Sequence, residues 1–199
     1  INVHAGAQNF VLHDIMSAGL TFKGVTKVEH IVPPNDTHVV EAGKYTVVTE
    51  GLTDGCAFHV VFTPEFCDEL EDNDKVIVYY TAMLNRNAIV AGEGNSNTAK
   101  LEFGEDHFTT GDTTYTKTFG FDLVKTDSQN TLLDGAKFRI YDAETGGNEI
   151  GVVVLTTDDD GNVTVYRRAR PDEQEEGETV DILVKDGKVR VVGLDNGRK

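Results

Sequence analysis

The stretch that most constrains the fold is a seven-residue segment that ends in a lysine, Phe119 to Lys125. Apolar and polar side chains alternate along it, with Phe119, Phe121 and Leu123 on one face, and this period of two is typical of a half-buried β-strand. The same alternation puts Lys125 on the apolar face, so the pattern aims an ammonium group at a core. Since an unpaired buried charge is costly, such a lysine is neutralised, paired or chemically consumed; the alternative is a strand-end lysine whose amine reaches water.

The residues that follow this strand read as further short strands joined by polar turns. Leu133–Ala136 leads into Phe138–Asp142, and the segment 186–197 lies near the end of the chain. In this order the motifs resemble the Cna B-type domain of Gram-positive surface proteins and pilins. The resemblance implies that Lys125 is the amine of an isopeptide bond. The family's asparagine and assisting glutamate for this bond are not in the 199 residues, so either they lie outside this sequence or the domain is incomplete.

Length and composition favour one or two domains and argue against nucleic acid and membranes as partners. Short strands alternate with Gly- and Asp-rich turns through most of the 199 residues, which favours all-β sandwiches. The net charge of −16 opposes binding to nucleic acid or to anionic membranes, because both repel an acidic protein. The chain has no apolar run long enough to span a membrane, so no membrane span is predicted.

Two polar residues in the first half lie in line with core positions. The alternation of Asn9–Asp14 puts Asp14 on the face of Phe10, and the later alternation puts Asn97 on the face of Leu101. Asp14 is either an Asx turn or cap at a strand end, or a buried acid with a raised pKa that donates a hydrogen bond. Asn97 is either a turn residue or a buried amide that needs hydrogen-bond partners.

Alternation and turn residues predict the remaining elements. Thr63 followed by Pro64 predicts the start of a short helix, and Tyr80 shares a face with Val76 and Val78 in the clearest strand. Strands are expected at 20–22, 25–31, 38–40, 45–49, 58–62, 75–85, 97–103, 150–155, 163–166, 180–184 and 188–192. Segment 105–114 is interpreted as an interdomain connection, 158–162 as a hairpin turn and 170–177 as a solvated acidic loop.

The motifs of the first half, taken in order, resemble the middle, isopeptide-forming domain of backbone (major) fimbrial pilins. They are Leu12–Asp14 with Gly19–Phe22, Tyr80–Asn85 with Ala88, and Asn97–Phe103. The resemblance implies that Asp14 is the assisting acid and Asn97 the acceptor of a Lys–Asn bond, with Asn95 as the runner-up acceptor. The family's lysine precedes the acid by a strand or more. Residues 1–13 contain no lysine, so this bond is not expected within the 199 residues as given.

The two resemblances together imply a fold and a function. They imply two tandem immunoglobulin-like β-sandwich domains: an isopeptide-forming pilin domain at 1–108 without its first strand, and a Cna B-type (transthyretin-like) domain at 109–199 without its last strands. The implied function is an extracellular shaft subunit of a cell-wall-attached pilus, joined to neighbouring pilin subunits by sortase. The alternative is a cell-wall-anchored adhesin that uses the same domains as a stalk or to bind host extracellular matrix.

The remaining reactive side chains carry no recognisable motif. A disulfide between Cys56 and Cys67 would contribute about 2–3 kcal/mol, but the strand predicted between them holds its ends apart and favours two free thiols. The six histidines are scattered without metal-ligand spacing, and no nucleophile motif is present in context. We therefore expect no metal, no cofactor and no enzyme turnover beyond the single self-modification.

Overall fold

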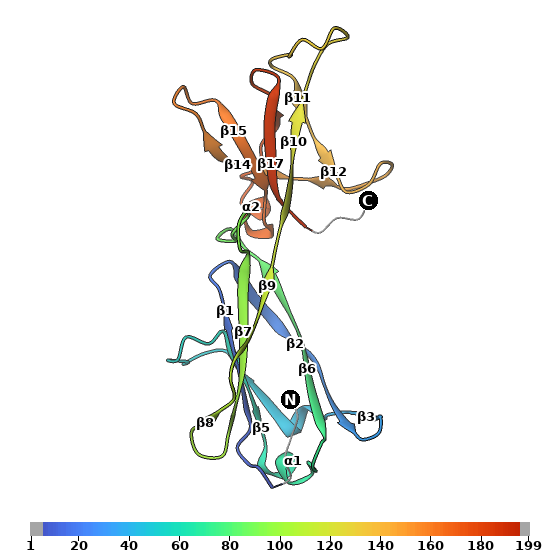
Figure 1. Ribbon diagram of the computed structural model, residues 1–199, viewed down its shortest axis with the longest axis vertical. Coiled ribbons are helices and arrows are strands. Elements are labelled where there is room, and N and C mark those ends of the chain that lie inside the picture. The colour runs from blue at the N-terminus through green and yellow to red at the C-terminus, as the bar shows by residue number, and fades with distance from the viewer. Residues whose placement is uncertain (1–5, 196–199) are drawn as a thin grey trace. The chain divides into compact units, whose positions relative to one another are not determined.

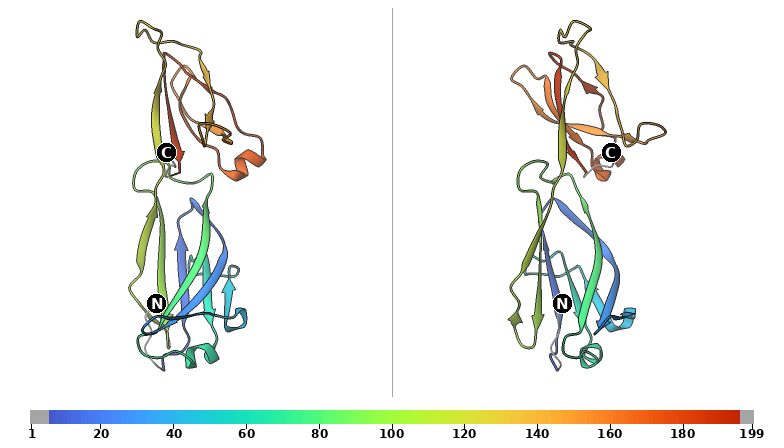
Figure 2. Two further views of the ribbon diagram at one scale, coloured as in Figure 1. Left: turned by 90° about the vertical axis from the view of Figure 1, so that its right-hand side faces the viewer. Right: turned by 45° about the vertical axis from the view of Figure 1, so that its right-hand side comes forward.

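The computed structural model describes residues 6–195, which form two compact units (Figures 1 and 2). The first unit takes the chain up to Met83 together with 96–115, and the second takes 84–95 together with the chain from Thr116 onward. Nearly all regular structure in both is β, which confirms the predicted all-β class. This division falls after Tyr115, whereas the sequence placed the boundary between 108 and 109.

The first unit is a sandwich of two sheets. One sheet has the strand order β4-β5-β1-β7-β8, with β9 also paired to β7, and the other has the order β3-β2-β6. The elements are β1 (Val11–Met16), β2 (Leu20–Val32), β3 (Asp36–Val39), the 3-10 helix η1 (Ala42–Lys44), β4 (Tyr45–Val48), β5 (Phe58–Phe62), α1 (Pro64–Asp68), β6 (Lys75–Leu84), β7 (Asn95–Phe103), β8 (His107–Phe108) and β9 (Asp112–Thr116).

The core of this unit lies between the two sheets. Phe58 of β5, Val28 of β2 and Val76 of β6 are almost completely buried in one cluster, against which Tyr80 also packs. Val76, Val78 and Tyr80, which share a face by alternation, therefore all pack toward this core. Helix α1 begins as predicted, because the side chain of Thr63 accepts a hydrogen bond from the backbone N–H of Phe66 (3.2 Å).

The segment predicted as an interdomain connection is part of the first sheet, and that prediction was wrong. Strand β8 pairs antiparallel with β7, Glu102 opposite Phe108, and β9 also pairs with β7. The side chains of β8 and β9 are exposed along both strands. Because neither face is buried, these strands have a polar composition that looks like a loop.

The second unit has one larger sheet and two small ones. The order of the larger sheet is β10-β17-β15-β14, in which β15 and β17 run parallel; the small sheets pair β11 with β16 and β12 with β13. Its elements are β10 (Phe119–Val124), β11 (Lys137–Phe138), β12 (Ile140–Tyr141), β13 (Glu149–Ile150), β14 (Val152–Thr157), β15 (Val163–Arg168), α2 (Pro171–Glu175), β16 (Ile182–Leu183) and β17 (Lys188–Leu194). The predicted hairpin turn at 158–162 joins β14 to β15, with Asp158 accepting hydrogen bonds from backbone N–H groups inside the turn.

Strand β10 buries less of its apolar face than its alternation predicts. Leu123 packs against the core cluster, but Phe119 and Phe121 are 52% and 40% exposed. Strand β10 lies at the edge of its sheet, and the cluster extends only under its Leu123 end. Alternation identifies the residues that share a face but not whether that face is covered, so the expectation of three core-facing residues was wrong for the two phenylalanines.

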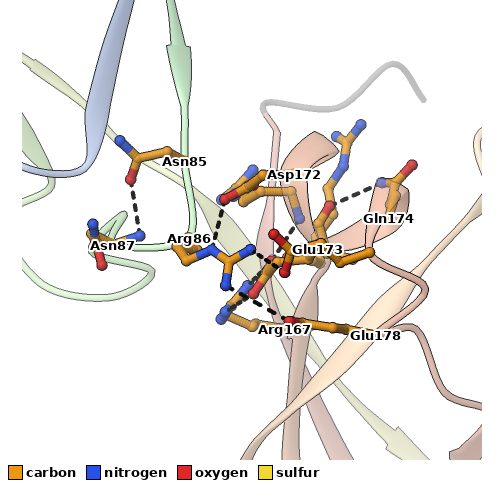
Figure 3. A network of polar contacts seen from close by, with 12 residues as sticks. Asn85, Arg86, Asn87, Arg167, Asp172, Glu173, Gln174 and Glu178 are labelled. Carbon is orange, nitrogen blue, oxygen red and sulfur yellow. Dashed lines mark hydrogen bonds and ion pairs between the residues drawn. The ribbon is translucent and has the colours of Figure 1, made fainter.

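The segment predicted as a solvated acidic loop contains helix α2, and this prediction was also wrong. Glu173 on this helix is only 3% exposed. Its carboxylate accepts from both terminal nitrogens of Arg167 and from the backbone N–H of Arg170 (2.8 Å), as Figure 3 shows in part. The Arg167 guanidinium, opposed by burial, keeps the pKa of Glu173 below its usual range. Glu173, the one acid of this acidic run that faces inward, therefore anchors α2 to Arg167 of β15.

Segment 84–95 is held within the second unit by ion pairs with α2 and its vicinity (Figure 3). Arg86 donates to Asp172 (2.7 Å) and to Glu176 (2.8 Å). These side chains are all partly exposed, and exposed pairs contribute about 0–1 kcal/mol each, so they orient the segment more than they stabilise it.

Replacing Glu173 tests the buried pair. We expect Glu173→Ala to lower the free energy of unfolding of the second unit by about 3 kcal/mol, because it leaves the Arg167 guanidinium without its partner. Glu175→Ala, on the same helix but exposed, is the matched control and should stay within about 0.5 kcal/mol of the parent. Urea unfolding followed by circular dichroism measures both; equal effects would contradict a buried ion pair.

Candidate functional site

Three polar side chains meet in the core of the first unit: Asp14 on β1, Tyr80 on β6 and Asn97 on β7. Strands β1 and β7 are antiparallel neighbours in one sheet, with Asp14 opposite Ala99, so Asn97 lies two residues further along on the same face. Tyr80 comes from the other sheet. The sandwich therefore brings together the two residues that the sequence singled out and adds a third.

Each of the three groups is hydrogen bonded to the other two. The Tyr80 hydroxyl donates to Asp14 Oδ2 (2.9 Å), and the Asn97 amide nitrogen donates to Asp14 Oδ2 (3.0 Å) and to the Tyr80 hydroxyl oxygen (2.7 Å). Asp14 is fully buried. The surroundings are aromatic, since the Phe58 ring packs edge-on against the Tyr80 ring (5.0 Å between centroids) and stacks on Phe22 (4.0 Å).

Two oxygen atoms of this cluster are buried without a hydrogen-bond partner among residues 6–195. They are Oδ1 of Asp14 and Oδ1 of Asn97. An unsatisfied buried polar atom costs about 1–3 kcal/mol, and the great majority of such atoms in native proteins are paired. Both orphan atoms are acceptors, so the cluster has room for a further hydrogen-bond donor.

Burial dominates the electrostatics of the cluster. Desolvation raises the pKa of Asp14, against the opposing effect of the hydrogen bonds from Asn97 and Tyr80. Desolvation and the hydrogen bond to Asp14 also raise the pKa of Tyr80 to about 12. Asp14 therefore keeps its proton to higher pH than an ordinary aspartate, while Tyr80 stays a neutral donor.

The runner-up acceptor, Asn95, has a different environment. It is fully buried, but its amide accepts from the backbone N–H of Ile89 (2.9 Å) and donates to the backbone carbonyls of Ile89 (3.0 Å) and Thr116 (3.3 Å). These contacts lie within the second unit and hold segment 84–95. Among the described residues, only Asn97 of the two asparagines is hydrogen bonded to Asp14.

Lys125 follows directly after β10 in the second unit. Its side chain is half-buried, and its amine donates to the backbone carbonyl oxygen of Thr126 (3.1 Å). Its backbone N–H donates to the carbonyl of Gly187 (2.8 Å), which ties it to the turn before β17. The amine therefore lies between core and solvent. This position is compatible both with a lysine consumed in a bond and with a strand-end lysine whose amine reaches water.

The sequence pattern placed Tyr80 on one face with Val76 and Val78 but gave it no role in a site. A signal was present: a tyrosine in line with Val76 and Val78 must find a partner for its buried hydroxyl. The two cysteines, Cys56 and Cys67, are free thiols, as the sequence favoured.

Comparison with known proteins finds likeness in structure alone. No family model matches the chain, and no curated protein matches it in sequence. Three solved structures are similar: the pilus 2b backbone protein of group B streptococcus (TM-score 0.59, 18% identity, 99% of this chain and 72% of that one), the full-length major pilin SpaD from Corynebacterium diphtheriae (0.53, 21%, 80% and 42%), and the pilus backbone RrgB from Streptococcus pneumoniae (0.51, 14%, 98% and 78%).

The chain has the fold of Gram-positive backbone pilins. It spans 42% of the length of SpaD, so the match covers less than half of that pilin. In residues 6–195, no helix combines the length and the apolar character that a membrane crossing requires.

The raised pKa of Asp14 predicts a pH-dependent effect of Asp14→Asn. The folded state binds the proton more tightly than the unfolded chain, so this group contributes stability at low pH that is lost as pH rises through its folded pKa. We therefore expect Asp14→Asn to gain stability relative to the parent as pH rises from about 4 to about 8. Urea unfolding across this range measures the difference, with the exposed Asp106→Asn as control. A pH-independent difference would contradict the burial effect.

Proposed function

We propose that the chain is a portion of a structural shaft subunit of a sortase-assembled Gram-positive pilus, stabilised by autocatalytic Lys–Asn isopeptide bonds. The pilin fold supports the shaft role. The observation that carries the covalent part is the Asp14–Tyr80–Asn97 cluster. In it a buried acid contacts an amide, and two oxygens have no donor in the part of the chain that the structure describes.

The proposed reaction forms one amide from another. A neutral lysine amine attacks Cγ of Asn97, the bond from Cγ to Nδ2 breaks, and the nitrogen leaves as ammonia. Asp14 lies 3.0 Å from Nδ2, so in its protonated form it can give its proton to the leaving nitrogen and recover one from the attacking amine. The net change is a lysine amine plus an asparagine amide giving a secondary amide plus ammonia.

The buried aromatic surroundings favour this reaction in three ways. Desolvation favours the neutral amine that can attack, and it raises the pKa of Asp14 so that the carboxyl retains its proton. Holding the groups in contact replaces a bimolecular encounter with a positioned one. Tyr80 orients the acid, because its hydroxyl lies within hydrogen-bond distance of both Asp14 and Asn97.

The pilin resemblance assigns the attacking amine to a strand that precedes Asp14. Residues 1–13 hold no lysine, so the reaction is proposed for the full-length parent protein. An ammonium or amide N–H placed there would fit the two orphan oxygens of Asp14 and Asn97. By the same resemblance, Lys125 is the proposed amine of a second bond in the second unit.

The proposed bond has a mechanical use. It would tie an early strand to β7, which lies beside β1 in the middle of its sheet. Pulling on the unit would then load a covalent bond in place of strand hydrogen bonds. This suits a shaft subunit outside the cell, whose neighbours are further pilin subunits joined by sortase.

Intact mass spectrometry of the full-length parent tests the covalent proposal. Each bond removes one ammonia, about 17 Da, so the deficit against the sequence mass counts the bonds. We expect Asn97→Ala and Asp14→Ala each to reduce the deficit by one ammonia, because they remove the acceptor and the acid. Asn95→Ala should leave the deficit unchanged.

Two results would contradict the proposal. A parent without any deficit would remove the covalent chemistry, and a deficit that survives in Asn97→Ala but disappears in Asn95→Ala would move the acceptor. Sortase assembly is tested separately by incubating the parent with a pilus sortase. We expect a ladder of covalent polymers on denaturing gels, whereas a product that stays monomeric would favour the adhesin alternative.

A further inference from the structure

A second polar cluster lies on the outer face of the same sheet, behind Asp14. Period two turns His13 of β1 away from the core, and its cross-strand partner on β5 is His59. The loop that enters β5 brings Asp54 and Cys56 to the same place. One ligand atom from each of these four residues lies within 4.8 Å of every other, and His13 comes from a part of the chain far from the other three.

The contacts within this cluster centre on one carboxylate oxygen. Oδ2 of Asp54 lies 3.0 Å from Nδ1 of His13 and 2.9 Å from Nε2 of His59, and the Cys56 thiol donates to it at 3.1 Å. The Cys56 sulfur is also 3.7 Å from Nδ1 of His13. Gly55, between Asp54 and Cys56, has a left-handed backbone (φ +79°) that lets both neighbours face the histidines.

A carboxylate behind the cluster orients His13. Nε2 of His13 lies 2.7 Å from Oε2 of Glu102 on β7, so an N–H at Nε2 would leave the Nδ1 lone pair for the cluster. Histidines that bind metals almost always donate their other ring N–H to a carboxylate, carbonyl or water. His13 is 5% exposed, while the Asp54 side chain is about one-third exposed, so the cluster is supported from inside and open from outside.

We propose that His13, Asp54, Cys56 and His59 form a tetrahedral binding site for a divalent transition-metal ion, with Zn²⁺ as the preferred ion. In tetrahedral zinc sites the metal–ligand bonds are about 2.0–2.3 Å, which puts neighbouring ligand atoms about 3.3–3.8 Å apart. The cluster already has its ligand atoms 2.9 to 4.8 Å apart, so small side-chain movements complete the tetrahedron.

The donor types select the class of metal. Two imidazoles and one thiol suit zinc and similar ions, whereas calcium takes six to eight oxygen ligands and magnesium prefers an octahedron of oxygens. Charge also balances. Zn²⁺ displaces the thiol proton and any proton shared between an imidazole and Asp54, and the thiolate and carboxylate together neutralise the two positive charges.

The cluster is poorly arranged for the other chemistry that a Cys–His pair suggests. A cysteine nucleophile needs a depressed pKa, but burial and the hydrogen bond to Asp54 raise the pKa of the Cys56 thiol to about 12. The sulfur is also closer to the carboxylate than to His13. Metal coordination overcomes this obstacle, because a coordinating thiol is deprotonated outright.

The bound ion would fasten the loop before β5 onto the sheet. Asp54 and Cys56 lie on that loop, while His13 and His59 lie on two hydrogen-bonded strands, so one ion would cross-link three segments of the first unit. Metal binding that requires the folded arrangement stabilises the folded state in proportion to the logarithm of free metal over Kd.

Metal titration of the whole chain tests the site. The protein is stripped with a chelator under a non-coordinating reductant and titrated with Co²⁺. We expect one equivalent to give the thiolate-to-cobalt charge-transfer band and the intense visible bands of tetrahedral cobalt, and Zn²⁺ to displace it. We also expect Zn²⁺ to raise the midpoint of thermal unfolding as its concentration rises.

Variants assign the binding to these residues. Cys56→Ala should abolish the charge-transfer band, and His59→Ala should weaken Zn²⁺ binding by more than about 100-fold, because each removes one ligand. Cys67→Ala and His38→Ala are the matched controls, since both lie in the same unit outside the cluster, and they should leave one-to-one binding intact. His59 and Cys56 are only partly buried, so these two variants are expected to fold.

Glu102→Gln separates orientation from ligation. We expect the cobalt spectrum to be retained while the affinity falls about 10–100-fold, as is typical when an outer partner of a ligating histidine is changed. A parent with neither a cobalt spectrum nor saturable one-to-one Zn²⁺ binding would overturn the proposal. Binding that survives unchanged in both Cys56→Ala and His59→Ala would overturn it as well.

Discussion

A carboxyl group without access to water is the constraint on which the first unit depends. Asp14 sits on a strand in the middle of its sheet, and nothing in an apolar core compensates a bare negative charge. The structure meets this demand by bringing Tyr80 across from the opposite sheet and Asn97 from the adjacent strand. The register of β1 against β7 and the packing of the two sheets are therefore both linked to one acid.

The two faces of the first sheet differ chemically where β1 carries Asp14. Inside, Asp14 contacts an amide among aromatic rings, which is the environment of the proposed isopeptide reaction. Outside, one residue earlier on the same strand, His13 lies among carboxylates, a thiol and a second imidazole, which is the environment of the proposed metal site. Period-two alternation alone places two unlike sites back to back on β1.

Much of the first site could be predicted from sequence, because parity along a strand is a local property. Asp14 and Asn97 stand out as polar residues in apolar register, and strand pairing then brings them together. The His13–Asp54–Cys56–His59 cluster could not be found this way: Asp54, Cys56 and His59 lie close together in sequence, but only the pairing of β1 with β5 brings His13 to them. The inward turn of Glu173 was also missed, because it depends on Arg167 rather than on its acidic neighbours. Similarly, the exposure of Phe119 depends on what covers a face, which a single strand does not encode.

The path of segment 84–95 has a practical meaning for dissecting this protein. The chain leaves the first unit after β6, contributes Arg86 and Asn95 to the second unit, and returns to form β7. No single cut of the polypeptide can therefore release the second unit whole. A recombinant fragment that starts near Thr116 would lack the contacts of Arg86 and Asn95. A circularly permuted chain, or segment 84–95 co-expressed with the fragment, would keep them.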